Sequence, residues 1–259
     1  AYAIKALREA SVHTTWVGPV EAFENAVLDW VDVLFDGPVT SMITEFVEPL
    51  ARGAVRISLG RKLLQLTGPG IPDVYQGTEF FDDSLVDPDN RRFVDYTARQ
   101  QTLDILDEGV DWEDLAAEAE AQLATTGDYP HLDLYGDRAK LHIVHEGLKV
   151  RTEHPEYFVG GEMQAVFAVG PAEAHLIGLA RGASNVPGEQ GIGVITLATR
   201  RPLDLERRGG WQDTTVTLPE GTWLDRLTCR TYENTVPLSE VLRIFPTALL
   251  VRQPVERDV

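Results

Sequence analysis

The chain has 259 residues, a length typical of one or two domains. Its hydrophobic fraction of 43% and charged fraction of 25% are those of a globular protein, which excludes wholesale disorder. The net charge of −18 disfavours binding to nucleic acid and to anionic membrane surfaces. A single cysteine, Cys229, excludes an intrachain disulfide and is typical of a reducing compartment, so we expect a cytoplasmic protein.

The first part of the chain has the apolar spacing of helices. Apolar side chains recur three and four residues apart over residues 23–34, and the Gly37-Pro38 pair is expected to end that helix. Similar patterns follow over residues 43–50 and 55–66. The chain also starts without Met, in what resembles the middle of a helix, and we therefore expect it to be a piece of a longer protein.

Residues 67–79 are dense in glycine and proline, which excludes a helix there. We predict a short buried strand at residues 71–75 that opens into an acidic loop over residues 80–95. One strand among several helices forms no sheet, so the partners of this strand are expected outside the chain. Helical patterns resume over residues 94–124 and 138–151, with a break at Tyr129-Pro130.

After His154-Pro155 the pattern changes to short apolar or alternating runs separated by turn residues, which predicts a small antiparallel β-sandwich. The runs cover residues 165–169, 175–180, 193–199, 214–218, 222–227 and 248–252. The expected fold class is therefore α+β. Cys229 lies in a strand-like run, and we expect its side chain to be buried.

The loop after the predicted strand is the best candidate for a binding site, because ligands of parallel α/β folds lie beyond the carboxyl ends of the strands. Its side chains offer an aromatic ring, carboxylate acceptors and forked guanidinium donors, which together suit a polyhydroxyl ligand. The candidate residues are Tyr75, Glu79, Asp87, Asp89, Arg91 and Arg92. Composition alone favours the alternative, a solvated loop pinned by its own arginine–carboxylate pairs.

No local motif for a cofactor or a metal site stands out in the sequence. The sequence has no glycine-rich phosphate loop after a strand and no nucleophilic serine in an elbow motif. His142, His145 and Glu146 fall within one helical turn, but they lack the His-Glu-x-x-His order, and a packed or solvated helix face explains them better.

Residues 70–79, GIPDVYQGTE, resemble the eighth-strand motif of the α-amylase family of glycoside hydrolases. Three further segments narrow the resemblance to members that rearrange the reducing end of a maltodextrin. They are residues 84–96 with DPDNRR, residues 5–16 with HTTW, and residues 211–223 with WQDT and LPEGTW. The resemblance extends over essentially the whole chain in the same order.

This resemblance implies that the last α-1,4 bond of a maltodextrin is converted to an α,α-1,1 bond by intramolecular transglucosylation, with neither a metal nor an organic cofactor. Such chemistry needs two carboxyl groups roughly 5 Å apart and the exclusion of water. In the family an Asp, a Glu and an Asp on earlier barrel strands supply it, and no segment here matches those motifs. We therefore assign no catalytic residue and expect the chain alone to be inactive, with maltodextrin and the missing N-terminal barrel portion as its partners.

The resemblance also implies an architecture. Residues 1–60 would be a helical segment inserted before the last strand of a (β/α)8 barrel. Residues 61–156 would hold that strand, its loop and the closing helices, and residues 157–259 the β-sandwich. The loop candidates become substrate-binding or loop-scaffold residues, joined by His13 and Trp16. The flat ring of Trp16 is suited to packing against a pyranose ring, although a role in the hydrophobic core is an equally good interpretation.

A different class of function stays open, namely a non-catalytic module that binds glucan or packs on another subunit. Aromatic side chains exposed on the sandwich would favour it. The four available, Trp211, Trp223, Tyr232 and Phe245, mostly fall in strand-like runs, where burial is the default.

Overall fold

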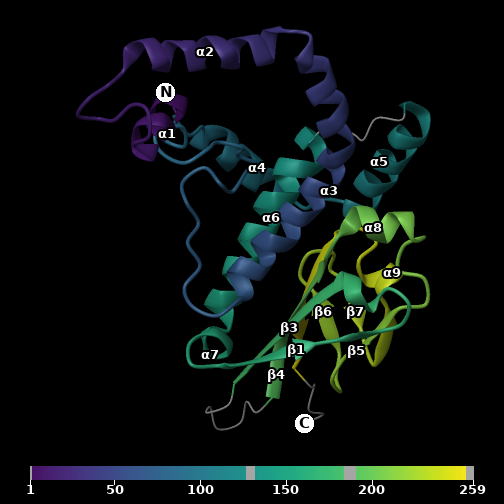
Figure 1. The fold of residues 1–259 in the computed structure, drawn as a ribbon. Helices are drawn as coiled ribbons and strands as arrows, with labels where there is room; N and C mark the ends of the chain where they lie inside the picture. The colour runs from purple at the N-terminus through teal and green to yellow at the C-terminus, as the bar shows by residue number, and fades with distance from the viewer. Residues whose placement is uncertain (1, 127–131, 184–190, 255–259) are drawn as a thin grey trace. The chain divides into compact units, whose positions relative to one another are not determined.

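The computed structural model describes residues 2–126, 132–183 and 191–254 (Figure 1). These residues form two compact units. Unit 1 comprises Ala1–Ala51 with Asp82–Asp95, and unit 2 comprises Arg52–Phe81 with Tyr96–Val259.

Unit 1 is built on helices. Helices α1 (Tyr2–Ala10) and α2 (Glu21–Asp36) are followed by the first part of α3 (Val39–Thr67). The chain leaves the helical conformation at Gly37-Pro38, as predicted. The two helical patterns predicted over residues 43–50 and 55–66 form one helix, α3, with Pro49 inside it. Three of the four residues between the two patterns, Ala51, Arg52 and Ala54, are strong helix formers, which favours continuation of the helix despite Gly53.

Unit 2 contains the rest of α3 together with α4 (Tyr96–Glu108), α5 (Trp112–Thr126), α6 (Leu132–Glu153) and the short α7 (Pro155–Phe158). The helix predicted over residues 94–124 is divided into α4 and α5. The division falls at Gly109, whose φ of +100° lies in the region that favours glycine. The predicted break at Tyr129-Pro130 lies outside the described residues.

The strand predicted at residues 71–75 is not formed within the described chain, and its predicted burial is not seen there. The segment has no regular secondary structure and belongs to no sheet of the described chain, and Ile71 is 96% exposed. Side chains bind its backbone instead: Gln65 Nε2 donates to the carbonyl oxygen of Asp73 at 2.6 Å, and Arg151 Nη2 to that of Gly70 at 3.1 Å. The physical reason is that a strand needs a neighbouring strand for its ladder of hydrogen bonds.

The C-terminal part of unit 2 forms two antiparallel sheets. The six-stranded sheet has the order β1 (Glu162–Val166), β3 (Leu176–Ala183), β4 (Gly191–Thr199), β9 (Thr247–Arg252), β6 (Trp223–Asp225) and β7 (Thr231–Tyr232). The three-stranded sheet has the order β2 (Ala168–Val169), β5 (Thr215–Thr217) and β8 (Thr235–Pro237). All six predicted runs contain a strand, whereas β7 and β8, of two and three residues, were not predicted.

Three short helical segments connect these strands. A 3-10 helix (Glu173–His175) precedes β3, α8 (Pro202–Arg207) follows β4, and α9 (Leu238–Val241) lies between β8 and β9. The prediction that Cys229 is buried is wrong. Cys229 lies in the turn between β6 and β7 with a φ of +58°, and its side chain is exposed because it belongs to the turn and not to a strand.

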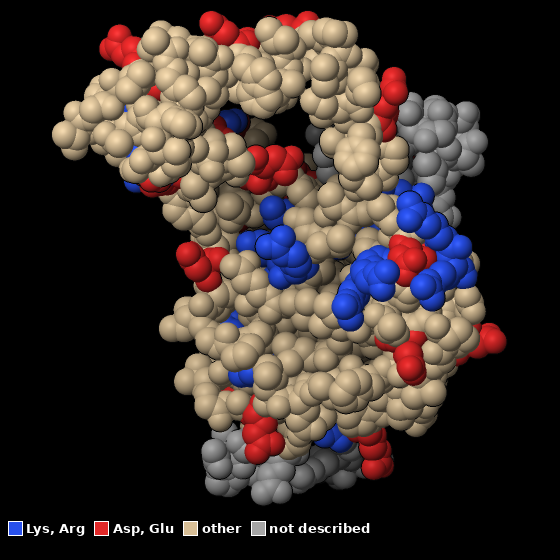
Figure 2. Space-filling model, viewed as in Figure 1, with Lys and Arg blue, Asp and Glu red and all other residues tan. Residues whose placement is uncertain are grey.

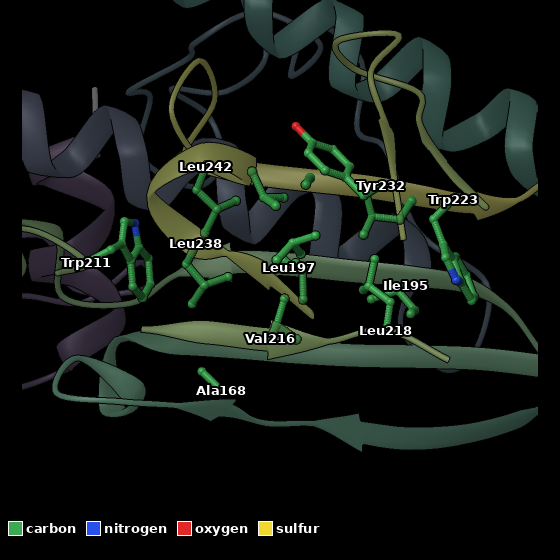
Figure 3. Close-up of a cluster of buried hydrophobic side chains, with 14 of the residues drawn as sticks. Ala168, Ile195, Leu197, Trp211, Val216, Leu218, Trp223, Tyr232, Leu238 and Leu242 are labelled. Atoms are coloured by element: carbon green, nitrogen blue, oxygen red, sulfur yellow. The ribbon is translucent and has the colours of Figure 1, made fainter. Parts of the chain in front are cut away.

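The two faces of the six-stranded sheet belong to different hydrophobic clusters. Ile195 and Leu197 on β4 contribute to the cluster shared with Ala168 and Val216 of the three-stranded sheet (Figure 3). Val194, the residue before Ile195, contributes instead to the cluster formed with the helices. This alternation is the period of two that a strand imposes on its side chains.

The helix-side cluster of unit 2 depends on close packing of α3 and α6 (Figure 1). Leu59, Leu63 and Leu66 of α3 are buried there with Ile143 of α6. A Cβ atom at Gly147 would lie 2.8 Å from Leu66 Cδ1, so α6 approaches α3 at a position that only glycine fills without a clash.

The prediction that the late aromatic side chains are buried is confirmed. Trp223 and Phe245 are almost completely buried, and Trp211 and Tyr232 are nearly so.

Within the described part of the chain, no helix has the length and apolar character needed to cross a membrane.

Candidate functional site

Trp16 is an exposed aromatic side chain held in place by a cation. It lies in the loop between α1 and α2, and it is 57% exposed. The guanidinium carbon of Arg8, on α1, lies 5.2 Å from the centre of the indole ring. A cation at this distance attracts the face of the ring, so the Trp16 side chain is ordered against α1 and still presents surface to solvent.

A buried carboxylate fixes Arg8. Glu24 on α2 is only 4% exposed, and it accepts two hydrogen bonds from Arg8, at 2.8 Å from Nε and 2.7 Å from Nη2. Thr14 Oγ1 also donates to Glu24 at 2.5 Å and accepts from the Val20 amide at 2.9 Å. The hydrogen bond from Arg8, which has the largest effect, and the one from Thr14 lower the pKa of Glu24 to about 2. The loop that carries Trp16 is thus tied at both ends by a charged network.

His13 lies in the same loop and packs against α2. Its ring centre is 5.0 Å from that of Phe23, with the planes tilted by 58°. This contact gives His13 a structural role at the base of the loop, next to Thr14 of the Glu24 network.

The loop over residues 82–95 carries the two arginine–carboxylate pairs that the sequence suggested. Arg91 forms an ion pair with Asp87, and Arg92 with Asp89. Each pairing, through a hydrogen bond from the arginine, lowers the pKa of the aspartate. Asp89 Oδ2 also accepts from the Leu85 amide at 2.8 Å, so these carboxylates shape the loop.

The same loop is joined to the start of the chain. Lys5 Nζ on α1 donates a hydrogen bond to the carbonyl oxygen of Asp87. The guanidinium groups of Arg91 and Arg92 remain well exposed to solvent beside this junction. Unit 1 therefore combines an exposed indole, held by a cation–π contact with Arg8, with forked cationic donors held by ion pairs.

Tyr75 and Glu79 lie in unit 2. Tyr75 is exposed, and its carbonyl oxygen accepts from the amide and hydroxyl of Thr78 at 3.0 and 2.7 Å, which closes a turn. Glu79 Oε2 pairs with Arg99 Nε at 3.3 Å, and the Arg99 guanidinium lies 4.4 Å from the centre of the Phe80 ring. Glu79 is therefore engaged in fixing this turn against α4.

The structure thus divides the predicted site residues between the two units. Unit 1 holds six of them and unit 2 holds the other two. Sequence reasoning missed Arg8, Thr14 and Glu24, which organise the Trp16 loop. Arg8 and Glu24 are 16 residues apart and lie on different helices, so no local spacing pattern pairs them.

The His142, His145 and Glu146 group is accounted for by packing and ion pairing. His142 Nε2 lies 3.0 Å from the carbonyl oxygen of Leu227, and burial lowers the pKa of its imidazole. Glu146 pairs with Arg226 at 2.8 Å. Among the residues that the structure describes, no group of three or more His, Cys, Asp or Glu side chains could hold a metal ion.

Comparison with known proteins identifies relatives along nearly the whole chain. A curated sequence from Mycobacterium tuberculosis strain H37Rv, which carries the name maltooligosyl trehalose synthase, is 38% identical over 251 residues. The match covers 97% of this chain and 28% of the relative. A sequence from strain CDC 1551 of the same species matches equally. No family model matches the chain.

Solved structures carry the same name. The maltooligosyltrehalose synthase of Arthrobacter ramosus superposes with a TM-score of 0.77 at 37% identity, over 97% of this chain and 29% of that one. A Sulfolobus tokodaii structure superposes with a TM-score of 0.60 at 23% identity, over 96% of this chain and 28% of that one, and shows the fold alone.

Over nearly its whole length the chain is therefore homologous to a part of maltooligosyl trehalose synthases. It spans somewhat more than a quarter of the length of the relatives it matches, at 28% and 29%. The family resemblance found in the sequence is confirmed by these matches.

Proposed function

We propose that this chain functions as the C-terminal part of a maltooligosyl trehalose synthase. The whole enzyme would act as a (1→4)-α-D-glucan 1-α-D-glucosylmutase, an isomerase that converts the reducing-end α-1,4 bond of a maltodextrin to an α,α-1,1 bond. The observation that carries the proposal is 38% identity over 97% of this chain to relatives of which it covers 28%. The α-amylase motif at residues 70–79 supports the same reaction class.

We assign the parts of the chain as follows. Residues 1–60 form a helical segment before the last strand of a (β/α)8 barrel, residues 61–156 hold that strand with its loop and closing helices, and residues 157–259 form a β-sandwich domain. Two features support this assignment. Residues 71–75 have no partner strand in the described chain, and the two antiparallel sheets share one hydrophobic cluster.

The chain would contribute to substrate binding and leave the bond chemistry to another part of the enzyme. The acid/base and nucleophilic carboxylates would come from the preceding barrel strands. Trp16 would present its ring to a glucose unit, and Arg91 and Arg92 would donate to sugar hydroxyl groups. In unit 1, Asp87, Asp89 and His13 would brace these residues, and in unit 2 Tyr75 and Glu79 would be substrate-binding or loop-scaffold residues. Substrate-binding residues also help to exclude water, which would otherwise hydrolyse the glucosyl intermediate.

The partners of this chain would be the maltodextrin and the barrel that precedes it, in the cytoplasm and with no cofactor. The alternative of a glucan-binding module centred on the sandwich finds less support. Trp211, Trp223, Tyr232 and Phe245 are buried, so none of these four offers a flat aromatic surface to a sugar.

The test measures reducing ends during incubation with maltohexaose. The 259-residue chain alone should leave the reducing ends unchanged, whereas a longer chain that includes the barrel should consume them. The product should then contain a non-reducing trehalose terminus. Conversion by the 259-residue chain alone would contradict the proposal, and so would an inactive, folded full-length protein.

A further inference from the structure

Unit 2 contains an arginine-lined cavity that the proposed reaction does not use. Its volume is about 490 Å³, within the usual range of small-molecule sites. It lies where the second half of α3, the segment after α8 and the segment after α9 meet. Its apolar lining includes Leu59, Leu205, Trp211, Leu242 and Phe245.

The charge of this cavity is opposite to that of the chain. Its charged lining residues are Arg52, Arg56, Arg243 and Glu206, a net charge of +2 in a chain whose net charge is −18. Figure 2 shows Lys and Arg side chains gathered around α8 on this face. A local reversal of sign of this size concentrates anions at the cavity.

One carboxylate holds two of these arginines side by side. Glu206 Oε1, on α8, pairs with Arg52 Nη2 at 2.7 Å and with Arg56 Nη1 at 2.9 Å. The three side chains are about 30% exposed, so solvent screens them only in part. Because one carboxylate neutralises only one guanidinium, this cluster keeps one positive charge.

Arg243, the third arginine of the cavity lining, also shares a carboxylate with a second arginine. Arg243, after α9, forms an ion pair with Glu113 of α5, and Glu113 also pairs with Arg230. Again two guanidinium groups share one carboxylate. The cationic groups of the cavity are thus oriented before a ligand arrives, and little side-chain entropy remains to be lost on binding.

We propose that this cavity binds an organic phosphate, a phosphomonoester whose body has an apolar face. A phosphomonoester carries a charge of roughly −1.5 to −2 near neutral pH, which matches the +2 lining. The planar guanidinium forks suit its oxygens. The apolar side chains on the cavity floor would contact the body of the ligand. A carboxylate has half that charge, and a neutral glucan would leave the surplus uncompensated.

Calorimetry on the 259-residue chain at constant ionic strength tests this inference, with inorganic phosphate, phenyl phosphate and acetate as probes. Both phosphates should bind saturably, and phenyl phosphate should bind at least tenfold more tightly than inorganic phosphate because its ring reaches the apolar floor. Acetate should not saturate. No saturable binding of either phosphate, or equal binding of acetate, would overturn the proposal.

Two variants of the cavity predict changes of opposite sign. Arg56→Gln should weaken phenyl phosphate binding at least tenfold, whereas Glu206→Gln, which raises the lining charge to +3, should strengthen it severalfold. Arg61→Gln is the matched control, because Arg61 is exposed on the same helix outside the cavity lining. Circular dichroism checks that each variant is folded. If Arg56→Gln unfolds, weaker binding by Glu206→Gln would still overturn the inference, as would equal losses in Arg56→Gln and Arg61→Gln.

Discussion

The hydroxyl of Thr196 on β4 donates a hydrogen bond to the hydroxyl of Thr67 at the end of α3, at 2.9 Å. Both residues are completely buried. Thr67 in turn donates to the carbonyl oxygen of Leu63 at 2.9 Å. This chain of hydroxyl groups joins the helical layer of unit 2 to the centre of its six-stranded sheet.

The direction of this hydrogen bond predicts unequal effects of the two Thr→Val substitutions. Thr67→Val should lower the free energy of unfolding by about 1–3 kcal/mol, because it leaves the buried Thr196 donor without its acceptor. Thr196→Val should cost about 1 kcal/mol, since Thr67 still donates to Leu63. Urea unfolding of the single and double variants measures both effects, and the double variant should lose less than the sum.

A matched control for this pair is Thr152→Val, because Thr152 is exposed on α6 and donates only along its own helix, to Leu148. Its substitution should change the free energy of unfolding by less than about 0.5 kcal/mol. Additive losses at positions 67 and 196 would show that the two hydroxyl groups are not coupled.

Asp225 predicts a pH dependence on the acidic side of neutrality. Its carboxyl group is completely buried, and this burial raises its pKa to about 6. Hydrogen bonds from Thr228 and from the amides of Leu227 and Leu249 oppose the rise. Because the pKa is higher in the folded state, the folded chain binds more protons between about pH 4 and pH 6. The contribution of Asp225 to stability is therefore full below about pH 4 and is lost as the pH rises through 6.

Asp225→Asn should flatten this profile, because the amide keeps an oxygen acceptor and does not titrate. Urea unfolding at intervals from pH 4 to pH 7 measures it. Wild type should lose up to about 3 kcal/mol relative to the variant across this window, from a shift of about two pKa units. Parallel profiles for the two proteins would exclude Asp225 as the titrating group.

Glu24 predicts a pH dependence of stability opposite to that of Asp225: here stability is lost as the pH falls. Hydrogen bonds from Arg8 and Thr14 lower its pKa to about 2, from an ordinary value of 4.5. Its contribution to stability should be complete above about pH 4.5 and should be lost as the pH falls toward 2. In Glu24→Gln, the midpoint of thermal unfolding should be lower at pH 6 and should depend less on pH between 5 and 2.

The control for Glu24 is Glu21→Gln, since Glu21 is exposed in the same first turn of α2. That variant should keep the acid sensitivity of wild type. If Glu21→Gln and Glu24→Gln have the same profile, the bidentate pair with Arg8 does not set the acid limit of this chain.

Arg92→Ala tests the role proposed for the loop over residues 82–95, in a full-length synthase that contains this chain. Turnover of maltohexaose should fall about tenfold or more, because the loop loses a positioning donor. The exposed Arg207→Ala should leave the kinetics unchanged. Unchanged kinetics in Arg92→Ala would limit Arg92 to holding the loop through Asp89.

Local pattern was enough to predict much of this fold, because its signals are short-range. A short, mainly apolar run over residues 193–199 predicted β4, and the three-and-four spacing over residues 23–34 predicted α2. Strands β7 and β8 were missed because two or three residues are too few to show a period. The family relationship was also evident from sequence alone, since motifs such as GIPDVYQGTE are specific without any coordinates.

The sequence by itself determined the fold class, the helical and strand-rich parts, the burial of the late aromatic side chains and the relatives of this chain. Only the tertiary structure decided that residues 71–75 form no strand here, because strand formation depends on a neighbour. It alone paired Arg8 with Glu24 and gathered Arg52, Arg56 and Arg243 around one cavity. Contacts between residues distant in sequence arise from packing, which local periodicity does not encode.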